Sequence, residues 1–284
     1  MGNSRSLDTY AAHNKTIWFI IYFFLCLTAF SMLIPFAWML SSSLKLNKDV
    51  FAFPMQWIPR EPRWKNYSTI WTQIPLARYI YNTFKLAIII TILQLLSSSF
   101  AAYAFAKLRF PGRRGLFLGY IATIAVPWQA YMVPQFILMR SMGLNNTHLS
   151  IICLQAFSAF GVFMMKQFYE SIPDELREAA RIDGLSEYGV WWRIMLPLSK
   201  PALSTLTIIT FVNTWNDFLG PLIYLTRTDL KTIQIGLRSF ISQYSSEYGL
   251  IMAASVVALI PVLIIFLSLQ RYFVQGVAST GIKG

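Results

Sequence analysis

The side chains that most often carry metal or nucleophilic chemistry are few and isolated in this sequence. Cys26 and Cys153 each lie inside an apolar run, and neither His13 nor His148 has a second ligand-type residue nearby. Because such sites need several of these groups together, we expect no catalytic residue, no metal site and no disulfide framework. The phosphate-binding pattern GxxxxGK[ST] is also absent from the sequence, so we expect the chain itself to bind neither ATP nor another cofactor.

Four side chains in the apolar run 202–224 could contact a polar solute. They are Asn213, Trp215, Asn216 and Asp217. Polar residues inside a membrane span usually face the bundle interior or a wet cavity. Amides and a carboxylate can hydrogen bond to sugar hydroxyls, and an indole ring can stack on the apolar face of a sugar. The cluster therefore indicates a substrate path, unless Asp217 merely caps or pairs near the break at Gly220-Pro221 and shapes the helix.

The second candidate site is the charge-dense stretch ELREAARIDGLSEYGVWWRIMLP, residues 175–197, which separates two apolar runs. The preceding residues 171–174, SIPD, predict a helix start with acids in the first turn. Gly184 predicts that this helix ends in a left-handed conformation. The pair Ser186-Glu187 predicts the start of a second helix, which Pro197 is expected to close. The stretch is either a solvated loop resting on the bundle or a docking element for a soluble partner.

The composition around these candidate sites is that of a membrane protein. The 284 residues are 56% hydrophobic and 13% charged, with a mean hydropathy of +0.50, whereas soluble domains average about 25% charged residues. The formal net charge is +12, but the basic residues fall in short segments between apolar runs and form no continuous stripe. Anionic lipid headgroups are therefore the expected partner of these charges, and nucleic acid is not.

Six apolar runs approach the length of about 20 residues that a helix needs to cross a bilayer. In chain order, the runs extend approximately from Ile17 to Leu40, from Leu86 to Ala106, from Gly115 to Met139, from Leu149 to Met165, from Ala202 to Tyr224, and from Tyr248 to Gln270. The first is too long for a signal-peptide core, so we interpret it as an uncleaved anchor. Pro127 and Pro134 predict kinks in the third. The sequence thus predicts an all-α, polytopic bundle of six transmembrane helices.

The density of basic residues orients this bundle. Residues 107–114, KLRFPGRR, hold four basic residues and no acid, which is typical of a cytoplasmic loop. Six spans then place both termini in the cytoplasm. The predicted organisation is a cytoplasmic tail 1–16, an anchor 17–44, an extracytoplasmic segment 45–85, a core 86–272 with five spans and a cytoplasmic loop 166–201, and a cytoplasmic tail 273–284.

The charge-dense stretch also resembles a known motif. Its residues and spacing are similar to the EAA motif of ABC importer permeases. The matching pattern is Glu178-Ala179-Ala180, then three residues, Gly184, then nine residues, Ile194, then one residue, and Leu196-Pro197. The segments IPDELREAARIDG, LPLSKPAL, TWNDFLGPLIYL, YGLIMAASVVALIPVLIIFLSLQRYFVQG and ASTGIKG resemble the carbohydrate-importer branch that includes the maltose permease. The resemblance runs from about residue 60 to the end and also includes the first span.

The resemblance implies the transmembrane domain of a type I ABC importer, with the motif as a coupling helix in a cleft of an ATP-binding subunit. The residues that it assigns to this contact are Glu178, Ala179, Ala180, Asp183, Gly184, Ile194, Leu196 and Pro197. It also implies that the C-terminal tail, including Gln275 and Gly276, reaches toward the ATPase.

The partners implied by the resemblance are a second, homologous permease, two copies of an ATP-binding subunit that holds ATP and Mg, and an extracytoplasmic solute-binding protein. The expected location is the bacterial inner or plasma membrane. The expected cargo is a mono-, di- or oligosaccharide. The alternatives are a polyol, a glycerol phosphate or a glycerophosphodiester carried by the same kind of permease, or an ion-coupled secondary transporter that uses Asp217.

Overall fold

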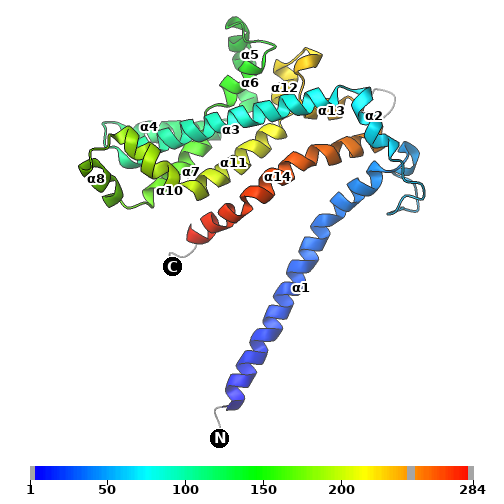
Figure 1. Cartoon of the computed structure of the whole chain (residues 1–284), viewed down its shortest axis with the longest axis horizontal. Coiled ribbons are helices and arrows are strands. Elements are labelled where there is room, and N and C mark those ends of the chain that lie inside the picture. The colour runs from blue at the N-terminus through cyan, green and yellow to red at the C-terminus, as the bar shows by residue number, and fades with distance from the viewer. Residues whose placement is uncertain (1–3, 242–246, 281–284) are drawn as a thin grey trace. The chain divides into compact units, whose positions relative to one another are not determined.

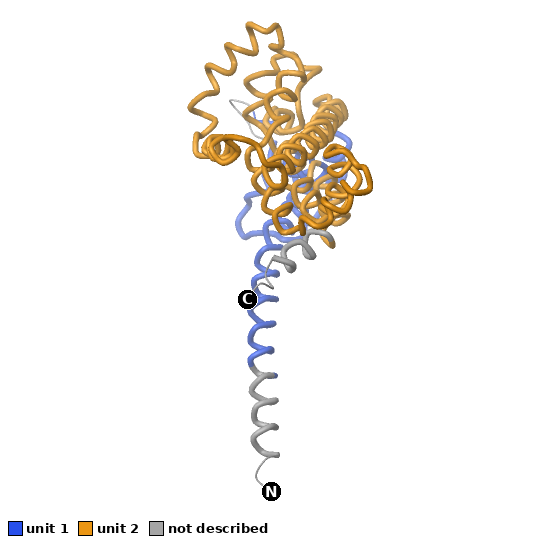
Figure 2. Tube along the Cα trace, turned by 90° about the vertical axis from the view of Figure 1, so that its left-hand side faces the viewer, with its two compact units in different colours: residues 1–70, 240–257 blue, residues 71–239, 258–284 orange. Residues whose placement is uncertain are grey.

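The structure is a computed structural model that describes residues 4–241 and 247–280, with side chains given for 15, 17–241 and 247–271. Every regular element in these ranges is a helix, so the all-α prediction is confirmed. The chain divides into two compact units, residues 1–70 with 240–257 and residues 71–239 with 258–284 (Figure 2).

The first unit is built around a long apolar helix. It contains α1 (Ser4–Ser43), η1 (Asn47–Asp49) and parts of α2 (Lys65–Gln73) and α14 (Tyr248–Thr280). Along α1 the large apolar side chains, such as Phe23 and Phe30, are exposed. Exposed apolar surface of this kind marks a contact with lipid or with another chain, and Ile17–Ser43 is long and apolar enough to cross a bilayer, as the expected anchor requires.

A tightly bonded turn follows α1 in this unit. The side chain of Lys45 is buried, donates to the Gln56 carbonyl at 2.5 Å and lies 3.9 Å from the centre of the Trp38 ring. The amide of Asn66 donates to the carbonyls of Ser43 and Lys45, both at 2.9 Å. Because these bonds satisfy buried polar groups, residues 44–66 form an ordered turn that is fixed to the end of α1.

The second unit is a helical bundle. Its helices are α3 (Leu76–Lys107), α4 (Arg113–Ala122), α5 (Met132–Ser141), α6 (His148–Gln155), α7 (Ala159–Glu170), α8 (Glu175–Ile182), α9 (Glu187–Val190), α10 (Leu196–Leu198), α11 (Lys200–Trp215), α12 (Leu219–Tyr224), α13 (Ile233–Arg238) and the later part of α14. Short turns of other helix types are η2 (Thr123–Ala125), η3 (Trp128–Ala130), η4 (Trp191–Met195) and η5 (Thr228–Leu230).

Helices α3, α7 and α11 lie side by side and form the centre of the second unit (Figure 1). Their core includes Tyr103, Met165 and Leu206. A Cβ atom on Gly161 of α7 would lie 2.4 Å from the Ser98 hydroxyl of α3. Small residues thus allow two helix backbones to approach closely, as is common between membrane helices.

The lengths of several spans differ from those predicted. The second span is longer, because α3 begins at Leu76 and not at Leu86; charged residues such as Lys85 end an apolar run without ending a helix. Candidate spans by length and apolar character are Ile17–Ser43, Leu76–Lys107, His148–Ser171 and Tyr248–Arg271. Helices α9 to α11 add a fifth if the pair Glu187–Leu198 and Lys200–Trp215, bent by 78°, is counted as one.

The third predicted span is not a continuous helix. Helix α4 ends at Ala122 and α5 begins at Met132, with two 3-10 turns and the extended residue Pro127 between them. Proline removes a backbone donor and clashes with the preceding turn, so Pro127 breaks the helix where the sequence predicted only a kink. Within the described residues, no single helix in 115–139 is long enough to cross a bilayer.

Candidate functional site

The charge-dense stretch forms two short helices joined by a glycine turn. Gly184 has a φ of +83°, its N–H donates to the Arg181 carbonyl, and the Leu185 N–H donates to the Ala180 carbonyl, both at 3.0 Å. This pair of bonds is the Schellman arrangement that ends a helix through a left-handed residue. The predicted turn at Gly184 is therefore confirmed. The predicted start is shifted, because α8 begins at Glu175 with Asp174 at the N-cap position.

The second helix begins as predicted but does not end at Pro197. The Ser186 hydroxyl accepts a hydrogen bond from the Gly189 N–H at 3.2 Å, which caps α9. A π-helical turn at residues 191–195 follows, and the chain stays helical to Leu198. The wider turn directly precedes Pro197, whose missing N–H leaves one acceptor of a regular helix unused. The chain bends after this point, between α10 and α11.

An ion pair fixes the start of this loop to the end of α3. The Lys107 ammonium is buried and donates to the Ile172 carbonyl and to an Asp174 carboxylate oxygen, each at 2.6 Å. Hydrogen bonding to Lys107 lowers the pKa of the Asp174 carboxyl below its usual value. The buried cation thus joins α3 to the first turn of α8.

A second set of bonds fixes the middle of the loop to α3. The Glu187 carboxylate accepts hydrogen bonds from the Tyr103 hydroxyl at 2.5 Å and from Arg177 at both oxygens. Deeper in the bundle, the Trp191 indole N–H donates to the Ser99 hydroxyl at 2.9 Å. Helices α8 and α9 and the π-helical turn are therefore all bonded, directly or through Glu187, to α3.

The residues of the motif divide into an exposed set and an inward set. Glu178, Ala179, Asp183, Gly184 and Pro197 are exposed, whereas Ala180 is buried and Ile194 and Leu196 pack partly buried against the core of the second unit.

The inward set attaches the loop to the bundle, and the exposed set is accessible to a partner. Ile182 is 87% exposed. Ala180 is buried although Ile182 is exposed, because residues two apart lie on nearly opposite sides of a helix. No residue in the described ranges forms an ion pair or hydrogen bond with the Glu178 carboxylate.

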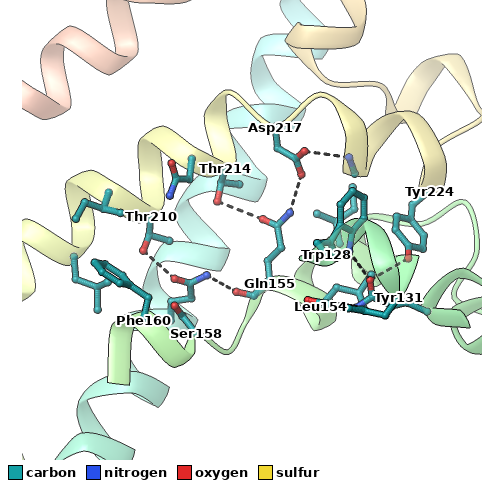
Figure 3. A pocket seen from close by; sticks show the side chains of 17 residues that line it. Trp128, Tyr131, Leu154, Gln155, Ser158, Phe160, Thr210, Thr214, Asp217 and Tyr224 are labelled. Atoms are coloured by element: carbon teal, nitrogen blue, oxygen red, sulfur yellow. Dashed lines mark hydrogen bonds between the residues drawn. The ribbon is translucent and has the colours of Figure 1, made fainter. Parts of the chain in front are cut away.

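The second candidate site is a partly open cavity of about 500 Å³ in the second unit (Figure 3). Its size falls in the range of small-molecule sites. It is lined by Gln94, Trp128, Tyr131, Gln135, Ile151, Leu154, Gln155, Ser158, Phe160, Leu206, Ile209, Thr210, Asn213, Thr214, Asp217, Gly220 and Tyr224. The broken third segment supplies Trp128 and Tyr131, so the break places aromatic side chains at the cavity.

A chain of hydrogen bonds runs along the cavity from Thr210 to Asp217 (Figure 3). Thr210 donates to the Gln94 amide oxygen at 2.9 Å, and the Gln94 amide donates to the Gln155 carbonyl at 2.6 Å. The Gln155 amide donates to one Asp217 oxygen at 2.8 Å, and the Gly220 N–H donates to the other at 3.0 Å. Asp217 thus caps the start of α12 and lines the cavity as well.

The four residues predicted for the substrate path are in different surroundings. Asn213 and Asp217 line the cavity. Trp215 does not, because its ring is 1% exposed, stacks on Phe211 and donates to the Ala258 carbonyl at 3.0 Å. Asn216 follows the end of α11, is exposed, and accepts a hydrogen bond from Gln234 at 3.3 Å outside the cavity lining.

Several site residues were missed by sequence reasoning. Gln94 and Gln155 are polar side chains inside the second and fourth predicted spans. The same signal, a polar side chain within an apolar run, indicated Asn213 and Asn216 in the fifth span. Tyr103, Lys107 and Glu187 gave no such signal, because their roles depend on contacts 65 to 84 residues apart in the sequence. The surroundings of Gln275 and Gly276 lie outside the described side chains.

The comparisons with known proteins agree with the motif. Residues 94–279 match the family described as "Binding-protein-dependent transport system inner membrane component". The arabinooligosaccharides transport system permease protein AraQ of Halalkalibacterium halodurans is 37% identical over 77% of this chain and 79% of its own. The lactose transport system permease protein LacG of Rhizobium radiobacter is 34% identical over 91% of this chain and 94% of its own.

A solved structure has the same fold. It is the crystal structure of a bacterial ABC transporter involved in the import of the acidic polysaccharide alginate, which matches with a TM-score of 0.81 at 24% identity, over 92% of this chain and 98% of that chain. The family match and the two permease relatives confirm the resemblance drawn from the EAA-like spacing. The chain belongs to the family of binding-protein-dependent transport system inner membrane components, the permeases of ABC importers.

Proposed function

We propose that this chain is the permease subunit of an ATP-driven, binding-protein-dependent importer of a carbohydrate. The names of AraQ and LacG, which are sugar-transport permeases, support the class of cargo. The cavity supports a small polar solute, because amides, hydroxyls and aromatic rings line it together. The chain forms half of the translocation path, and a second, similar permease forms the other half.

The observation that carries the proposal is the exposed Glu178, which pairs with no described residue, on a loop that is otherwise bonded to α3. ATP binding closes two ATP-binding subunits, which pull on residues 172–197. Because Lys107 and Glu187 join this segment to α3, the pull is transmitted to the bundle as a rigid-body movement. Glu178 pairs with a basic group of the ATP-binding subunit, and hydrolysis resets the transporter.

This assignment sets the roles of the other subunits and the topology. The chain is a non-enzymatic membrane component; ATP and Mg are held by the ATP-binding subunit, and an extracytoplasmic binding protein delivers the solute. The broken segment 115–139 serves as the third of six membrane crossings. Both termini and the coupling loop lie in the cytoplasm, and the tail near Gln275 and Gly276 reaches toward the ATPase.

Copurification tests the coupling role. The tagged chain is expressed with its chromosomal neighbours, extracted in mild detergent, and compared with Glu178→Lys and the control Glu61→Lys, an exposed glutamate in the segment before α2. We expect a second permease and an ATPase with the wild type and the control, and at least a tenfold loss of the ATPase with Glu178→Lys. An ATPase retained in full by Glu178→Lys would exclude Glu178 from the contact.

A further inference from the structure

The charge of the cavity bears on which carbohydrates this permease can accept. Among its described lining residues there is one carboxylate, Asp217, and no Lys, Arg or His. Four lining side chains carry amides: Gln94, Gln135, Gln155 and Asn213. An anionic solute that leaves water needs cationic or N–H-rich partners, and without them it pays a large desolvation cost. The described wall of the cavity thus offers an anion no positive side chain and one negative side chain.

Most polar groups along the cavity are already bonded within the protein. The Gln94 side chain accepts a hydrogen bond from Thr210 and donates one to a backbone carbonyl, and the Gln155 side chain donates one to Asp217. The Gln135 side chain accepts a hydrogen bond from the Trp128 indole at 2.8 Å. These bonds fix the wall before any solute arrives, which lowers the entropy cost of binding.

Two lining side chains keep their hydrogen-bonding capacity. Neither the amide of Asn213 nor the hydroxyl of Tyr131 bonds to any residue in the described ranges, and both are exposed. Each can donate and accept, which is what a sugar hydroxyl requires of its partner. Tyr131 lies with Trp128 and Tyr224 at one end of the cavity (Figure 3), where aromatic rings offer apolar faces to a sugar ring.

We propose that the cavity admits an uncharged saccharide and rejects anionic ones, with Asn213 and Tyr131 as its hydrogen-bonding contacts. Asp217 favours neutral saccharides and disfavours anionic ones, since a carboxylate accepts hydrogen bonds from neutral hydroxyls and repels uronate or phosphate groups. The proposal deepens the proposed function and depends on it. It also separates this chain from the alginate transporter, which it matches in fold and whose cargo is an acidic polysaccharide.

The test is uptake by the complete transporter with its binding protein in proteoliposomes. The probes are lactose and arabinotriose, which are neutral, and trimeric alginate and sn-glycerol 3-phosphate, which are anionic. We expect ATP-dependent uptake of a neutral probe and no uptake of either anionic probe above the rate without ATP. Preferential uptake of an anionic probe would overturn the charge argument.

Variants test the two contacts. Asn213→Ala and Tyr131→Ala each remove groups that can make neutral hydrogen bonds, so we expect uptake of the neutral probe to fall about three- to tenfold. Thr207→Ala is the matched control: its hydroxyl bonds at 2.7 Å to the Leu203 carbonyl in its own helix, and it does not line the cavity. Wild-type uptake by both Asn213→Ala and Tyr131→Ala would overturn the assignment of these contacts.

Two further measurements separate the possible failures. The melting temperature of each detergent-solubilised complex shows whether a variant has lost uptake merely through unfolding. Retention of the ATPase shows whether the importer is assembled. Uptake that is independent of ATP, from a chain that retains no ATPase, would contradict the proposed function itself, whereas ATP-driven uptake of an anion would contradict this inference alone.

Discussion

Gly184 is the residue on which the shape of the proposed coupling loop depends. Its φ of +83° belongs to the left-handed region, and the Schellman bonds around it direct the chain from α8 into α9. A Cβ atom at this position would meet no other atom within 4 Å. The cost of a side chain is therefore backbone strain alone, and steric crowding adds nothing to it.

We expect Gly184→Val to weaken coupling, because a β-branched residue disfavours this conformation by about 1–2 kcal/mol. Gly184→Asn should be milder, since Asn tolerates the left-handed region. The measurement is ATP hydrolysis stimulated by solute and binding protein. Gly119→Val is the control, at a helical glycine that also has open space around it. Wild-type stimulation in Gly184→Val would mean that the turn can form another way.

At the scale of elements, the loop is attached to α3, and the proposed coupling depends on this attachment. Glu187 on α9 joins Tyr103 on α3 to Arg177 on α8, so three helices meet at one carboxylate. Such a junction holds short helices in place that would be unstable alone. A loop attached in this way can transmit a pull to the bundle, whereas a loop joined only at its ends would move by itself.

Replacing Glu187 by Gln should separate docking from transmission. The neutral amide weakens the pair with Arg177, and hydrogen bonds to charged groups contribute roughly 1.5–3 kcal/mol. We expect the ATPase to copurify as before while solute uptake per ATP falls several-fold. The control is Glu170→Gln, which weakens an ion pair within α7 between the exposed Glu170 and Lys166. Loss of the ATPase from Glu187→Gln would instead place Glu187 in the docking surface.

At the scale of the whole molecule, the third apolar segment, residues 115–139, differs from a simple membrane span because it does not form one continuous helix. It is broken into α4 and α5, and the residues of the break include Trp128 and Tyr131 of the cavity wall. Broken helices occur at membrane depth where the backbone lines a cavity or is covered by protein. The break is thus linked to the site, and a six-span topology requires that the two halves together cross the membrane.

Cysteine accessibility tests that topology. In a background with Cys26 and Cys153 replaced by Ser, single cysteines are placed at Arg114 and Arg140, at the two ends of the broken segment. A membrane-impermeant maleimide added to intact cells should label Arg140→Cys, whereas Arg114→Cys should react only after the cells are opened. Labelling of both positions from the same side would show that the segment is re-entrant and would change the number of crossings.

The sequence by itself determined the class of protein, the family and the position of the EAA-like loop. Apolar runs, basic clusters and the spacing from Glu178 to Pro197 are local patterns. Such patterns can be recognised in a sequence without knowing how the helices pack. The glycine turn was predictable for the same reason, because its conformation depends on Gly184 and the helix before it.

Only the tertiary structure decided which residues form the cavity and which hold the loop. Trp215 and Asn213 are neighbours in one polar cluster of the sequence, yet one is buried against Phe211 and the other lines the cavity. The contacts of Gln94 with Thr210 and of Tyr103 with Glu187 join segments 116 and 84 residues apart. Such pairings depend on how α3 packs against α9 and α11, and no periodicity within one segment encodes them.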